Sequence, residues 1–501
     1  MLSTTVVVAG AGPTGLATAC GLRAAGVPVR VLDMAPGPAA TSRALGLQPR
    51  GAEVLDRLGA LGDLAERSVR ISQVLTYVDG RPLARLPVGR PTRLVTRPGL
   101  LMSQAEVEAR LRDRLAGLGV EVEWGREVLD VRQDPERVVL RLDHGEEEAG
   151  WLVGCDGAHS RVRKAAGIAF PGVPVVERFL LADVTAGLPV PRDTVAVWLR
   201  GDTMLGAFPL PGKDLWRLMA PAAPGSAADP ADSLAELLRR EAGVPRTAVR
   251  EVHWTSTFRI NRRLASSYRS GRLLLAGDAA HIHSPFGGQG MNTGLGDAEN
   301  LAWKLALVAT GRSDDALLDT YEAERRPVAR EVLSSTTAMT GVVLGRSTWA
   351  RALRDHVFVP LLDRPTVQRR LWEKSSQLTL SYRRGPLGTL HRLPRPLPGP
   401  APHPGDRVPD GPCIRQDGST TRLYEELRTG WALLSPGAPP SAQEAVALRH
   451  LGADKVTALT VPGGSRRTLL VRPDAHLAWR GTRAAALDRA LTRILGNGTG
   501  Q

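Results

Sequence analysis

Three short strings of residues, far apart in the chain, have the composition of a dinucleotide site. They are residues 10–15 (Gly-Ala-Gly-Pro-Thr-Gly), 156–157 (Asp-Gly) and 277–292, which starts Gly-Asp and contains Gly-Gly-Gln-Gly-Met-Asn. Glycines permit a tight turn and let a pyrophosphate approach backbone N–H groups, and the N-terminus of a following helix adds partial positive charge. In this order, the three strings predict FAD held by three parts of the chain, and hence a redox enzyme.

The first string lies at the centre of a β-α-β unit. The apolar run 5–9 indicates a buried strand, residues 14–25 a helix, and residues 29–32 the next strand, which Asp33 closes. A carboxylate at that point can bind a ribose diol, and it disfavours a 2′-phosphate. A glycine-rich turn without a ligand is the alternative, but the combination favours a dinucleotide. The expected contacts are Gly10, Gly12, Pro13, Thr14, Gly15 and Asp33.

The third string follows a strand at residues 273–276 and precedes a long helix at about 291–309. Asp278 either points into the ligand crevice at the carboxyl end of the sheet or caps a helix. The helix N-terminus would stabilise the negative charge of a reduced flavin, which favours the first interpretation. Asp278, His281 and His283 predict no metal, because no further ligand follows at a recognisable spacing. The expected cofactor contacts are Asp278, Gly288, Gln289, Gly290, Met291 and Asn292.

The remaining patterns predict an α/β protein in which a Rossmann-like FAD-binding domain is interleaved with a sheet-rich substrate-binding domain. Short alternating stretches with glycine and proline turns mark the latter. A helix over 321–338 is expected to be interrupted, or to start, near Pro327. The expected boundaries are 1–68, 102–173 and 264–385 for the FAD-binding domain, 69–101 and 174–263 for the substrate-binding domain, 386–412 for a proline-rich linker, and 413–501 for a small α/β domain.

Composition limits the other possibilities. The chain has 501 residues, and the scattered Cys20, Cys155 and Cys413 form neither a disulfide framework nor a metal-ligand pattern, so a reducing cytoplasm is expected. No apolar run is long enough to span a membrane, and no secretory signal precedes the first strand. The net charge of +14 is dispersed over short arginine clusters, so no nucleic-acid partner is predicted, although the charge could attract an anionic NADPH.

The motifs as a set resemble those of class A flavoprotein aromatic hydroxylases, which are related to para-hydroxybenzoate hydroxylase. The resemblance rests on 10–15, 42–50 (Ser-Arg-Ala-Leu-Gly-Leu-Gln-Pro-Arg), Gln104, 154–161 (Gly-Cys-Asp-Gly-Ala-His-Ser-Arg) and 277–304. The length, the tail and residues 321–328 (Tyr-Glu-Ala-Glu-Arg-Arg-Pro-Val) are most similar to those of polyketide-tailoring hydroxylases and rifampicin monooxygenases. The resemblance covers nearly the whole chain.

The resemblance adds further site residues. It implies FAD contacts at Arg43, at Gln104 and, through the backbone, at Val128, and it places Asp156 and Gly157 near the pyrophosphates of FAD and NADPH. Pro285, with Phe286 and Gly287 beside it, is implied to lie next to the flavin. The tail resembles a thioredoxin-like domain but has no Cys-x-x-Cys, so thiol redox work is excluded. Gly296 and Ser284 depart from the family pattern, which puts the local pocket shape in doubt.

The chemistry implied by the resemblance is carried by the flavin. NADPH (or NADH) would reduce FAD transiently, and O₂ would form a flavin C4a-hydroperoxide whose distal oxygen hydroxylates an electron-rich ring. No catalytic side chain is required. The expected substrate is a polycyclic, polyketide-type aromatic compound of antibiotic biosynthesis. Its pocket is expected between the flavin and the strand-rich segments. The candidate wall residues are Phe208, Trp216, Met219, Phe258 and Phe286. The alternative for each of them is a place in the hydrophobic core without contact to the substrate.

Three alternatives stay open. The same cofactor chemistry could insert oxygen beside a ketone in a Baeyer–Villiger reaction, or could inactivate an antibiotic by oxidation. From another class, the chain could be a non-catalytic flavin-binding regulatory protein. A flavin halogenase is disfavoured because no Trp-x-Trp-x-Ile-Pro string occurs. The expected state is a monomer or a homodimer.

Overall fold

The computed structural model describes residues 4–41, 44–89, 91–92, 94–95, 97–201, 203–223, 228–283, 288–344, 348–388, 402–437, 441–462 and 467–496. A mostly parallel sheet lies in the middle, with strand order β18-β19-β12-β1-β2-β8. Only β18 pairs antiparallel with its neighbour. The strands are β1 (Val6–Ala9), β2 (Val29–Asp33), β8 (Val122–Trp124), β12 (Trp151–Gly154), β18 (Arg269–Ser270) and β19 (Leu273–Leu275).

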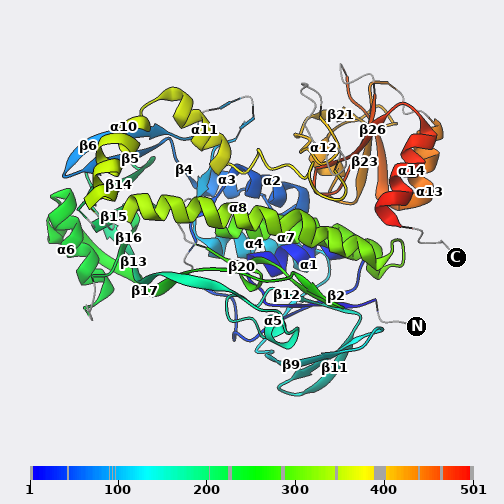
Figure 1. The fold of residues 1–501 in the computed structure, drawn as a ribbon, viewed down its shortest axis with the longest axis horizontal. Coiled ribbons are helices and arrows are strands. Elements are labelled where there is room, and N and C mark those ends of the chain that lie inside the picture. Colours follow the sequence, from blue (N-terminus) through cyan, green and yellow to red (C-terminus); the bar gives the residue numbers. More distant parts are fainter. Residues whose placement is uncertain are drawn as a thin grey trace.

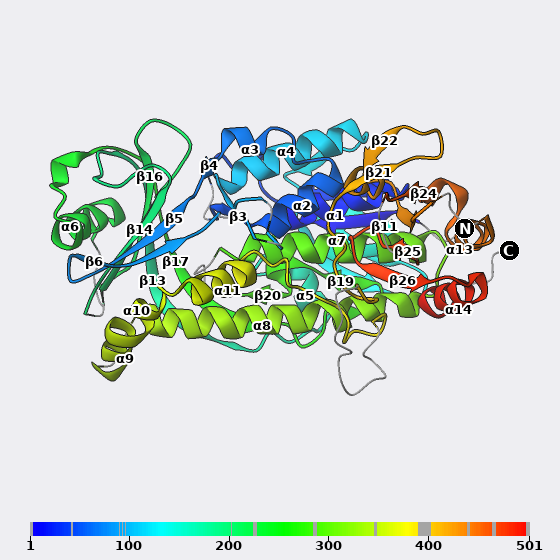
Figure 2. The same ribbon diagram turned by 90° about the horizontal axis from the view of Figure 1, so that it is seen from above.

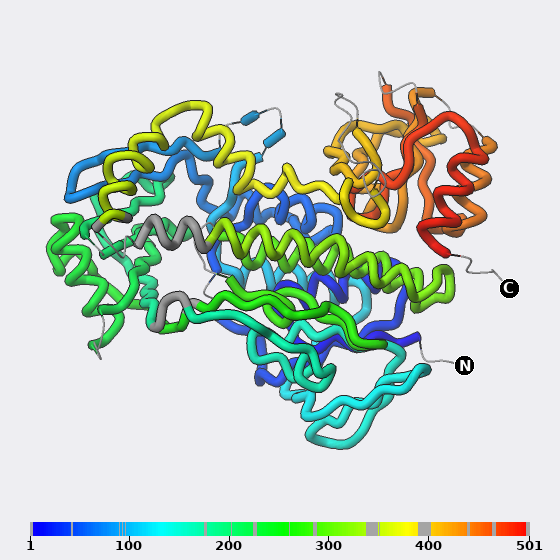
Figure 3. The backbone as a smooth tube through the Cα atoms, in the orientation of Figure 1, coloured from blue at the N-terminus to red at the C-terminus, as the bar shows by residue number. Residues whose placement is uncertain are grey.

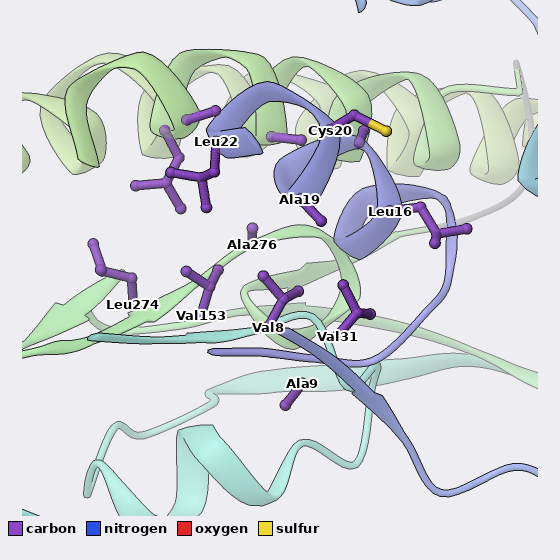
Figure 4. Close-up of a cluster of buried hydrophobic side chains, with 14 of the residues drawn as sticks. Val8, Ala9, Leu16, Ala19, Cys20, Leu22, Val31, Val153, Leu274 and Ala276 are labelled. Atoms are coloured by element: carbon purple, nitrogen blue, oxygen red, sulfur yellow. The ribbon is translucent and has the colours of Figure 1, made fainter. Parts of the chain in front are cut away.

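Apolar runs form this central sheet because both of its faces are covered. On one face, Leu16, Ala19 and Leu22 of the first helix lie over Val8 and Val31 of the strands (Figure 4). A small antiparallel sheet covers the other face (Figure 1). The covering elements are α1 (Pro13–Ala24), α4 (Gln104–Gly117) and α7 (Gly290–Ala309) on the first face, and β9 (Val128–Gln133), β10 (Val138–Leu142) and β11 (Gly145–Ala149) on the second.

A second sheet joins the two strand-rich segments of the chain. Its order is β20-β17-β13-β16-β15-β14-β5-β6, and the parallel pairing of β14 with β5 connects residues 194–199 to residues 73–78. One helix, α6 (Pro230–Ala242), covers one face of this sheet. The strands are β5 (Gln73–Val78), β6 (Arg81–Pro87), β13 (Gly172–Ala186), β14 (Thr194–Arg200), β15 (Thr203–Pro209), β16 (Leu215–Pro221), β17 (Val249–Leu264) and β20 (His281–Ile282).

The long helix α8 (Asp319–Leu344) connects the two ends of the molecule (Figure 2). The expected interruption near Pro327 does not occur, because this proline lies inside a continuous helix.

Shorter elements complete this part of the chain. The helices are α2 (Pro49–Leu58), α3 (Leu64–Arg67), α5 (Arg161–Ala165), α9 (Thr348–Leu353), the π-helical η4 (Arg354–Phe358), α10 (Val359–Leu361) and α11 (Pro365–Ser375), and the 3₁₀ turns are η1 (Arg246–Ala248), η2 (Gly277–Ala279) and η3 (Asp315–Leu318). A small sheet consists of β3 (Gly46–Leu47), β4 (Val69–Arg70) and β7 (Leu100–Leu101).

The C-terminal unit (residues 402–496) has its own sheet, of order β22-β21-β24-β23-β25-β26. Its core continues into α7, because Trp303 and Leu307 belong to the same buried cluster and Trp303 meets Trp431 edge-on at 5.3 Å. Its elements are β21 (Pro412–Ile414), β22 (Thr420–Arg422), α12 (Leu423–Glu426), β23 (Trp431–Ser435), α13 (Ser441–Leu451), η6 (Ala453–Lys455), β24 (Val456–Thr460), β25 (Thr468–Val471), β26 (Leu477–Gly481) and α14 (Ala484–Leu495). Of the expected linker 386–412, residues 389–401 lie outside the described residues.

The three cysteines are free thiols. Burial raises the pKa of Cys20 to about 12 and that of Cys413 to about 11. Both therefore stay protonated and unreactive at neutral pH. None of the helices in the described ranges combines the length and the apolar character needed to cross a lipid bilayer.

His476 of the C-terminal unit predicts sensitivity to acid. Its Nδ1 lies 2.9 Å from the carbonyl oxygen of Asp474, and its buried Nε2 has no partner among the described atoms. Burial lowers the pKa of His476 to about 4; the nearby Arg50 and Arg472 act in the same direction and Asp474 opposes them. The unfolded chain takes up a proton near pH 6.5 and the folded chain only near pH 4, so the stability should fall between these values, by up to about 3 kcal/mol.

Urea unfolding at a series of pH values measures this loss. The His476→Asn variant keeps a donor toward Asp474 but cannot titrate, so its stability should depend less on pH between 6.5 and 4. An identical pH profile for the two proteins would contradict the assignment.

Candidate functional site

One large cavity separates the central sheet and its helices from the eight-stranded sheet. Its volume is about 1660 Å³, which is more than a typical small-molecule pocket of roughly 300–1,000 Å³. All three predicted strings contribute to its lining, although they are up to about 280 residues apart in the chain. From the expected cofactor contacts, the lining includes Gly12, Pro13, Thr14, Gln104, Gly157, Asp278, Gly288, Gln289, Gly290 and Met291.

The glycines of the first string have different tasks. A Cβ on Gly10, whose φ is +104°, would lie 2.4 Å from the carbonyl oxygen of Cys155, and a Cβ on Gly15 would lie 1.9 Å from that of Gly10. Both glycines are therefore required for packing the turn against the sheet. A Cβ on Gly12 would meet no protein atom within 4 Å, and Gly12 borders the cavity. The space beside Gly12, at the start of α1, fits a phosphate group.

Asp33, at the end of β2, fastens this turn. Its Oδ2 accepts a hydrogen bond from the backbone N–H of Ala11 at 2.7 Å, and its Oδ1 accepts one from Ala35 at 2.8 Å. Asp33 lies outside the cavity lining, as does Val128, the buried first residue of β9. The structure thus shows Asp33 as a support of the glycine turn.

The second string divides its roles between its two residues. The Oδ2 of Asp156 accepts hydrogen bonds from the backbone N–H groups of Arg161 at 2.7 Å and Val162 at 3.1 Å, which caps the short helix α5. Gly157 has a φ of +75°, a conformation that favours glycine, and it borders the cavity. Asp156 therefore shapes the loop, and Gly157 presents the backbone to the cavity.

The N-terminus of α7 opens into the cavity through Gly288, Gln289, Gly290 and Met291. Asn292 points away from it: its amide donates to the carbonyls of Gly46 at 2.9 Å and Gly288 at 2.8 Å, and its Oδ1 accepts from Gln48 N–H at 2.8 Å. The sequence predicts a direct cofactor contact for Asn292. In the structure, its side chain instead holds the cavity-lining segment 46–48 against α7.

Asp278 lies in η2, directly after β19, and its exposed side chain borders the cavity. The backbone beside it packs closely, since a Cβ on Gly277 or on Gly294 would approach the Thr14 side chain to 2.6 Å or 2.2 Å. The side chain of Thr14, at the start of α1, thus fits between the loop after β19 and α7. These contacts bring residues from the first and third strings to one point.

A buried carboxylate stabilises this junction from behind. Asp297 of α7 accepts hydrogen bonds from Arg325 at 2.7 Å and from the backbone of Gly277 at 3.2 Å, and it pairs with His281 at 2.6 Å. Burial alone would raise the pKa of Asp297, but Arg325 and His281 hold it below its usual value. Asp297 is therefore ionised and ties α7 and α8 to the loop that carries Asp278.

A basic stretch borders the cavity between η2 and the eight-stranded sheet. The guanidinium of Arg163 donates to the carbonyls of Ala279 at 2.8 Å and Ala158 at 3.0 Å and stacks over Phe170 at 3.9 Å. These positive charges suit an anionic ligand. The basic lining consists of His159, Arg163, Lys164, Arg259, Arg263 and His283.

The wall on the eight-stranded sheet is mainly apolar and includes three of the predicted pocket residues, Phe208, Met219 and Phe258. Trp216, however, is wrong as a pocket residue. Strand side chains alternate between faces, so Met219 lies on the cavity face, whereas Trp216 is 1% exposed and packs against α6. The aromatic residue that the prediction missed on the cavity face is Trp254.

A helical wall of the cavity was also missed. The segment from η4 to α11 lines it, although its sequence carries no motif that distinguishes it from other amphipathic helices. Its lining residues are Arg354, Phe358, Val359, Leu362, Leu371, Trp372 and Ser375. The expected contacts at Arg43, Pro285, Phe286 and Gly287 lie outside the described residues.

Comparisons with known proteins agree with this geometry. Residues 3–336 match the family model described as FAD binding domain, and residues 401–498 match the one described as aromatic-ring hydroxylase, C-terminal. The 6-methylpretetramide 4-monooxygenase of Streptomyces rimosus is 38% identical, over 96% of this chain and 91% of that protein. The rifampicin monooxygenase of Streptomyces venezuelae is 36% identical over 95% of each chain.

A solved structure has the same fold. The OxyS anhydrotetracycline hydroxylase from Streptomyces rimosus superimposes with a TM-score of 0.78 at 32% identity, covering 98% of this chain and 99% of that one. The resemblance inferred from the motifs is therefore confirmed. The chain belongs to the FAD-dependent aromatic-ring hydroxylases, and it is a flavoprotein monooxygenase.

Proposed function

We propose that this enzyme hydroxylates a polycyclic, polyketide-type aromatic substrate, with NADPH or NADH as the electron donor, in antibiotic biosynthesis. One observation carries the proposal: a single cavity runs from the glycine turn and the α7 N-terminus to the apolar wall of the eight-stranded sheet. A cavity of about 1660 Å³ accommodates a dinucleotide cofactor together with a multi-ring ligand. The relatives named for pretetramide and anhydrotetracycline substrates support the same substrate class.

The described residues fit FAD. The open space beside Gly12 and the start of α1 suit the pyrophosphate, Gly157 gives backbone access, and Asp278 is an exposed carboxylate for a sugar hydroxyl. The first turn of α7 would face the pyrimidine end of the flavin, where its partial positive charge stabilises the reduced anion. We extend the cofactor role to the residues that lie outside the described ranges: Arg43, Pro285, Phe286 and Gly287.

Bound FAD supplies the redox chemistry, passing electrons from the nicotinamide to O₂ and delivering one activated oxygen atom to the substrate. The chain's own task is to orient the substrate ring and to exclude water. Phe208, Met219 and Phe258 provide apolar surface on one side, and the helical wall from η4 to α11 provides it on the other. The basic lining around Arg163 and Lys164 would attract the phosphates of the nicotinamide nucleotide.

We also propose that the C-terminal unit is a thioredoxin-like fold that has lost thiol chemistry. Its central strands support this, with β23 parallel to β24 and antiparallel to β25, and with helices α13 and α14 packed together. Cys413 is the one cysteine in this part of the sequence, and burial raises its pKa. Thiol–disulfide exchange would need a second cysteine, which this part of the sequence lacks, and the thiol of Cys413 is itself unreactive because it stays protonated.

The purified protein, loaded with FAD, tests the proposal in a screen of polycyclic phenols by stimulated NADPH oxidation. A stimulating phenol should yield a product that is heavier by one oxygen atom derived from ¹⁸O₂, with a new phenolic hydroxyl by NMR. A lactone would instead establish Baeyer–Villiger insertion, and turnover restricted to finished antibiotics would establish inactivation. FAD binding without any substrate-stimulated oxidation would favour the non-catalytic alternative.

The two faces of β16 and its neighbours give a paired prediction. Phe258→Ala removes an aromatic ring from the wall and enlarges the cavity. The KM for a polycyclic substrate should therefore rise about tenfold, which corresponds to a loss of roughly 1.4 kcal/mol of binding free energy. Trp216→Phe, on the opposite face, should lower the melting temperature and leave KM unchanged. Steady-state kinetics and thermal unfolding measure the two effects. An effect of Trp216→Phe on KM larger than that of Phe258→Ala would contradict the assignment of the faces.

A further inference from the structure

The turn between β25 and β26, residues 472–476, extends from the C-terminal unit into the FAD-binding part of the molecule. It is compact: the Arg472 N–H donates to the His476 carbonyl at 2.8 Å, and the Ala475 N–H donates to the Arg472 carbonyl at 3.0 Å. Arg472, Asp474 and His476 are at most 1% exposed although two of them are charged. Ionised groups are buried only where partners compensate them, so the partners of this turn define its task.

Arg472 and Asp474 bind two helices at once. The guanidinium of Arg472 donates to both carboxylate oxygens of Glu324 on α8, at 2.8 and 3.0 Å. Oδ2 of Asp474 accepts hydrogen bonds from Asn300 at 3.2 Å and from the Trp303 indole at 3.3 Å, both on α7. Arg472 and Asp474 also pair with each other. The turn therefore fixes α7 relative to α8.

The same turn reaches α2. Nη2 of Arg50, in the first turn of that helix, donates to the carbonyl oxygen of Asp474 at 3.0 Å and pairs with Glu299 of α7 at 3.3 Å. The residues just before α2, 44–48, line the cavity. In Figure 3 the C-terminal unit lies against the side of the molecule where α2 and α7 run.

A short route connects the turn to the cavity. Arg325 follows Glu324 on α8, and it donates to Asp297 at 2.7 Å and to the carbonyl of Thr293, in the first turn of α7, at 2.9 Å. Asp297 in turn accepts the backbone N–H of Gly277, next to the cavity-lining Asp278, at 3.2 Å. Arg325 also donates to the Tyr382 hydroxyl at 2.9 Å, and the Tyr382 ring lies 4.3 Å from that of His476.

We propose that the 472–476 turn is a positioning element of the flavin site. By holding α2, α7 and α8 together, Arg472 and Asp474 set the position of the α7 N-terminus and of the loop with Asp278. The C-terminal unit thereby sets the affinity and the reduction potential of a cofactor that it does not touch. This inference rests on the flavin site proposed above.

The balance of buried charge explains why single substitutions should move these helices. Arg472 and Lys304 face Glu324 and Asp474, and Lys304 donates to Glu324 at 2.8 Å, so two positive groups compensate two negative ones. Burial lowers the pKa of Lys304 to about 8, partly offset by Glu324, so Lys304 keeps its proton at pH 7. Without Arg472, the carboxylates of Glu324 and Asp474 are left with one cation and repel each other, which separates α8 from the turn.

The test compares Arg472→Met with the full-length wild type and with Leu459→Ala, all at pH 7. Leu459 of β24 is fully buried in the core cluster of the C-terminal unit that also contains Ala475, so its substitution weakens the packing of this unit without removing a charge or a hydrogen bond of the turn. Arg472→Met should bind FAD at least about tenfold more weakly by flavin fluorescence. The two-electron reduction potential of its bound FAD should fall by about 30 mV, which corresponds to a tenfold change in the equilibrium between oxidised and reduced flavin. The reason is that the displaced N-terminus of α7 stabilises the reduced anion less. Leu459→Ala should change neither quantity.

Two further variants complete the test. Arg472→Lys keeps the charge but not the forked hydrogen bonds, so it should restore part of the affinity and of the potential. Asp474→Asn keeps the shape of the turn and should reproduce the tenfold loss even if Arg472→Met does not fold. The proposal is overturned if either turn variant folds with wild-type affinity and potential, or if Leu459→Ala shifts both equally. A wild type that binds no FAD would instead refute the flavin site itself.

Discussion

The Gly12→Asp variant is expected to fold as well as the wild type and to bind FAD at least about 100-fold more weakly, a loss of roughly 2.7 kcal/mol. Gly12 precedes the first turn of α1 with a φ of −73° and a ψ of 178°, which any residue adopts, and aspartate is a favoured residue there. No protein atom would meet the new Cβ within 4 Å. The added carboxylate would instead fill the space proposed for the pyrophosphate and repel it.

Isothermal titration with FAD measures this loss, and thermal unfolding of the FAD-free protein checks the fold. Gly187→Asp is the matched control, because a side chain on this exposed glycine also meets no neighbour within 4 Å but lies away from the cavity. Gly12→Ser, with a smaller and neutral side chain, should give an intermediate loss. If Gly12→Asp binds FAD within threefold of the wild type, the pyrophosphate does not lie beside this turn.

The Asp297→Leu variant should lose about 3–5 kcal/mol of the free energy of unfolding, the usual cost of removing one partner from a buried ion pair. Arg325 is 2% exposed and would keep its charge without the carboxylate opposite. His281 and the backbone N–H of Gly277 would lose an acceptor as well. The Asp297→Asn variant retains one acceptor oxygen, so it should lose less.

Urea unfolding of the FAD-free protein, followed by circular dichroism, measures this change. The exposed pair Glu236–Arg239 on α6 provides the comparison, and Glu236→Leu should cost less than about 1 kcal/mol. A loss below about 1 kcal/mol for Asp297→Leu would show that the buried pair is dispensable.

Local geometry explains which parts of the site could be predicted. The β-α-β unit follows from local patterns within about 30 residues, so the turn formed by Gly10, Gly12 and Gly15 could be predicted from these glycines together with the flanking strand, helix and Asp33. The order of the three strings and the family resemblance were enough to predict a flavin-dependent aromatic monooxygenase, which the comparisons confirm. The strands of the C-terminal unit near residues 431–434 and 468–471 were also visible in the apolar pattern.

The missed residues depend on pairings between distant segments. Strand β16 is buried on both faces, so its apolar run does not show that Trp216 faces α6 and Met219 the cavity. Asn292 belongs to a glycine-rich string, yet its partners at Gly46 and Gln48 are set by how α2 packs on α7. Arg472 is one of many arginines in the sequence, and only the tertiary fold brings it to Glu324, 148 residues away.

The order in which the central sheet is assembled has a consequence for biosynthesis. β1 pairs on one edge with β2 but on the other with residues 151–154, which pair in turn with residues 273–275. On the ribosome, the nascent N-terminal third therefore has an unsatisfied strand edge until more than half of the polypeptide has emerged. The 472–476 turn, which contacts α2, α7 and α8, emerges only near the end of translation. A chain terminated before residue 273 would thus leave this strand edge unpaired, which favours aggregation and proteolysis.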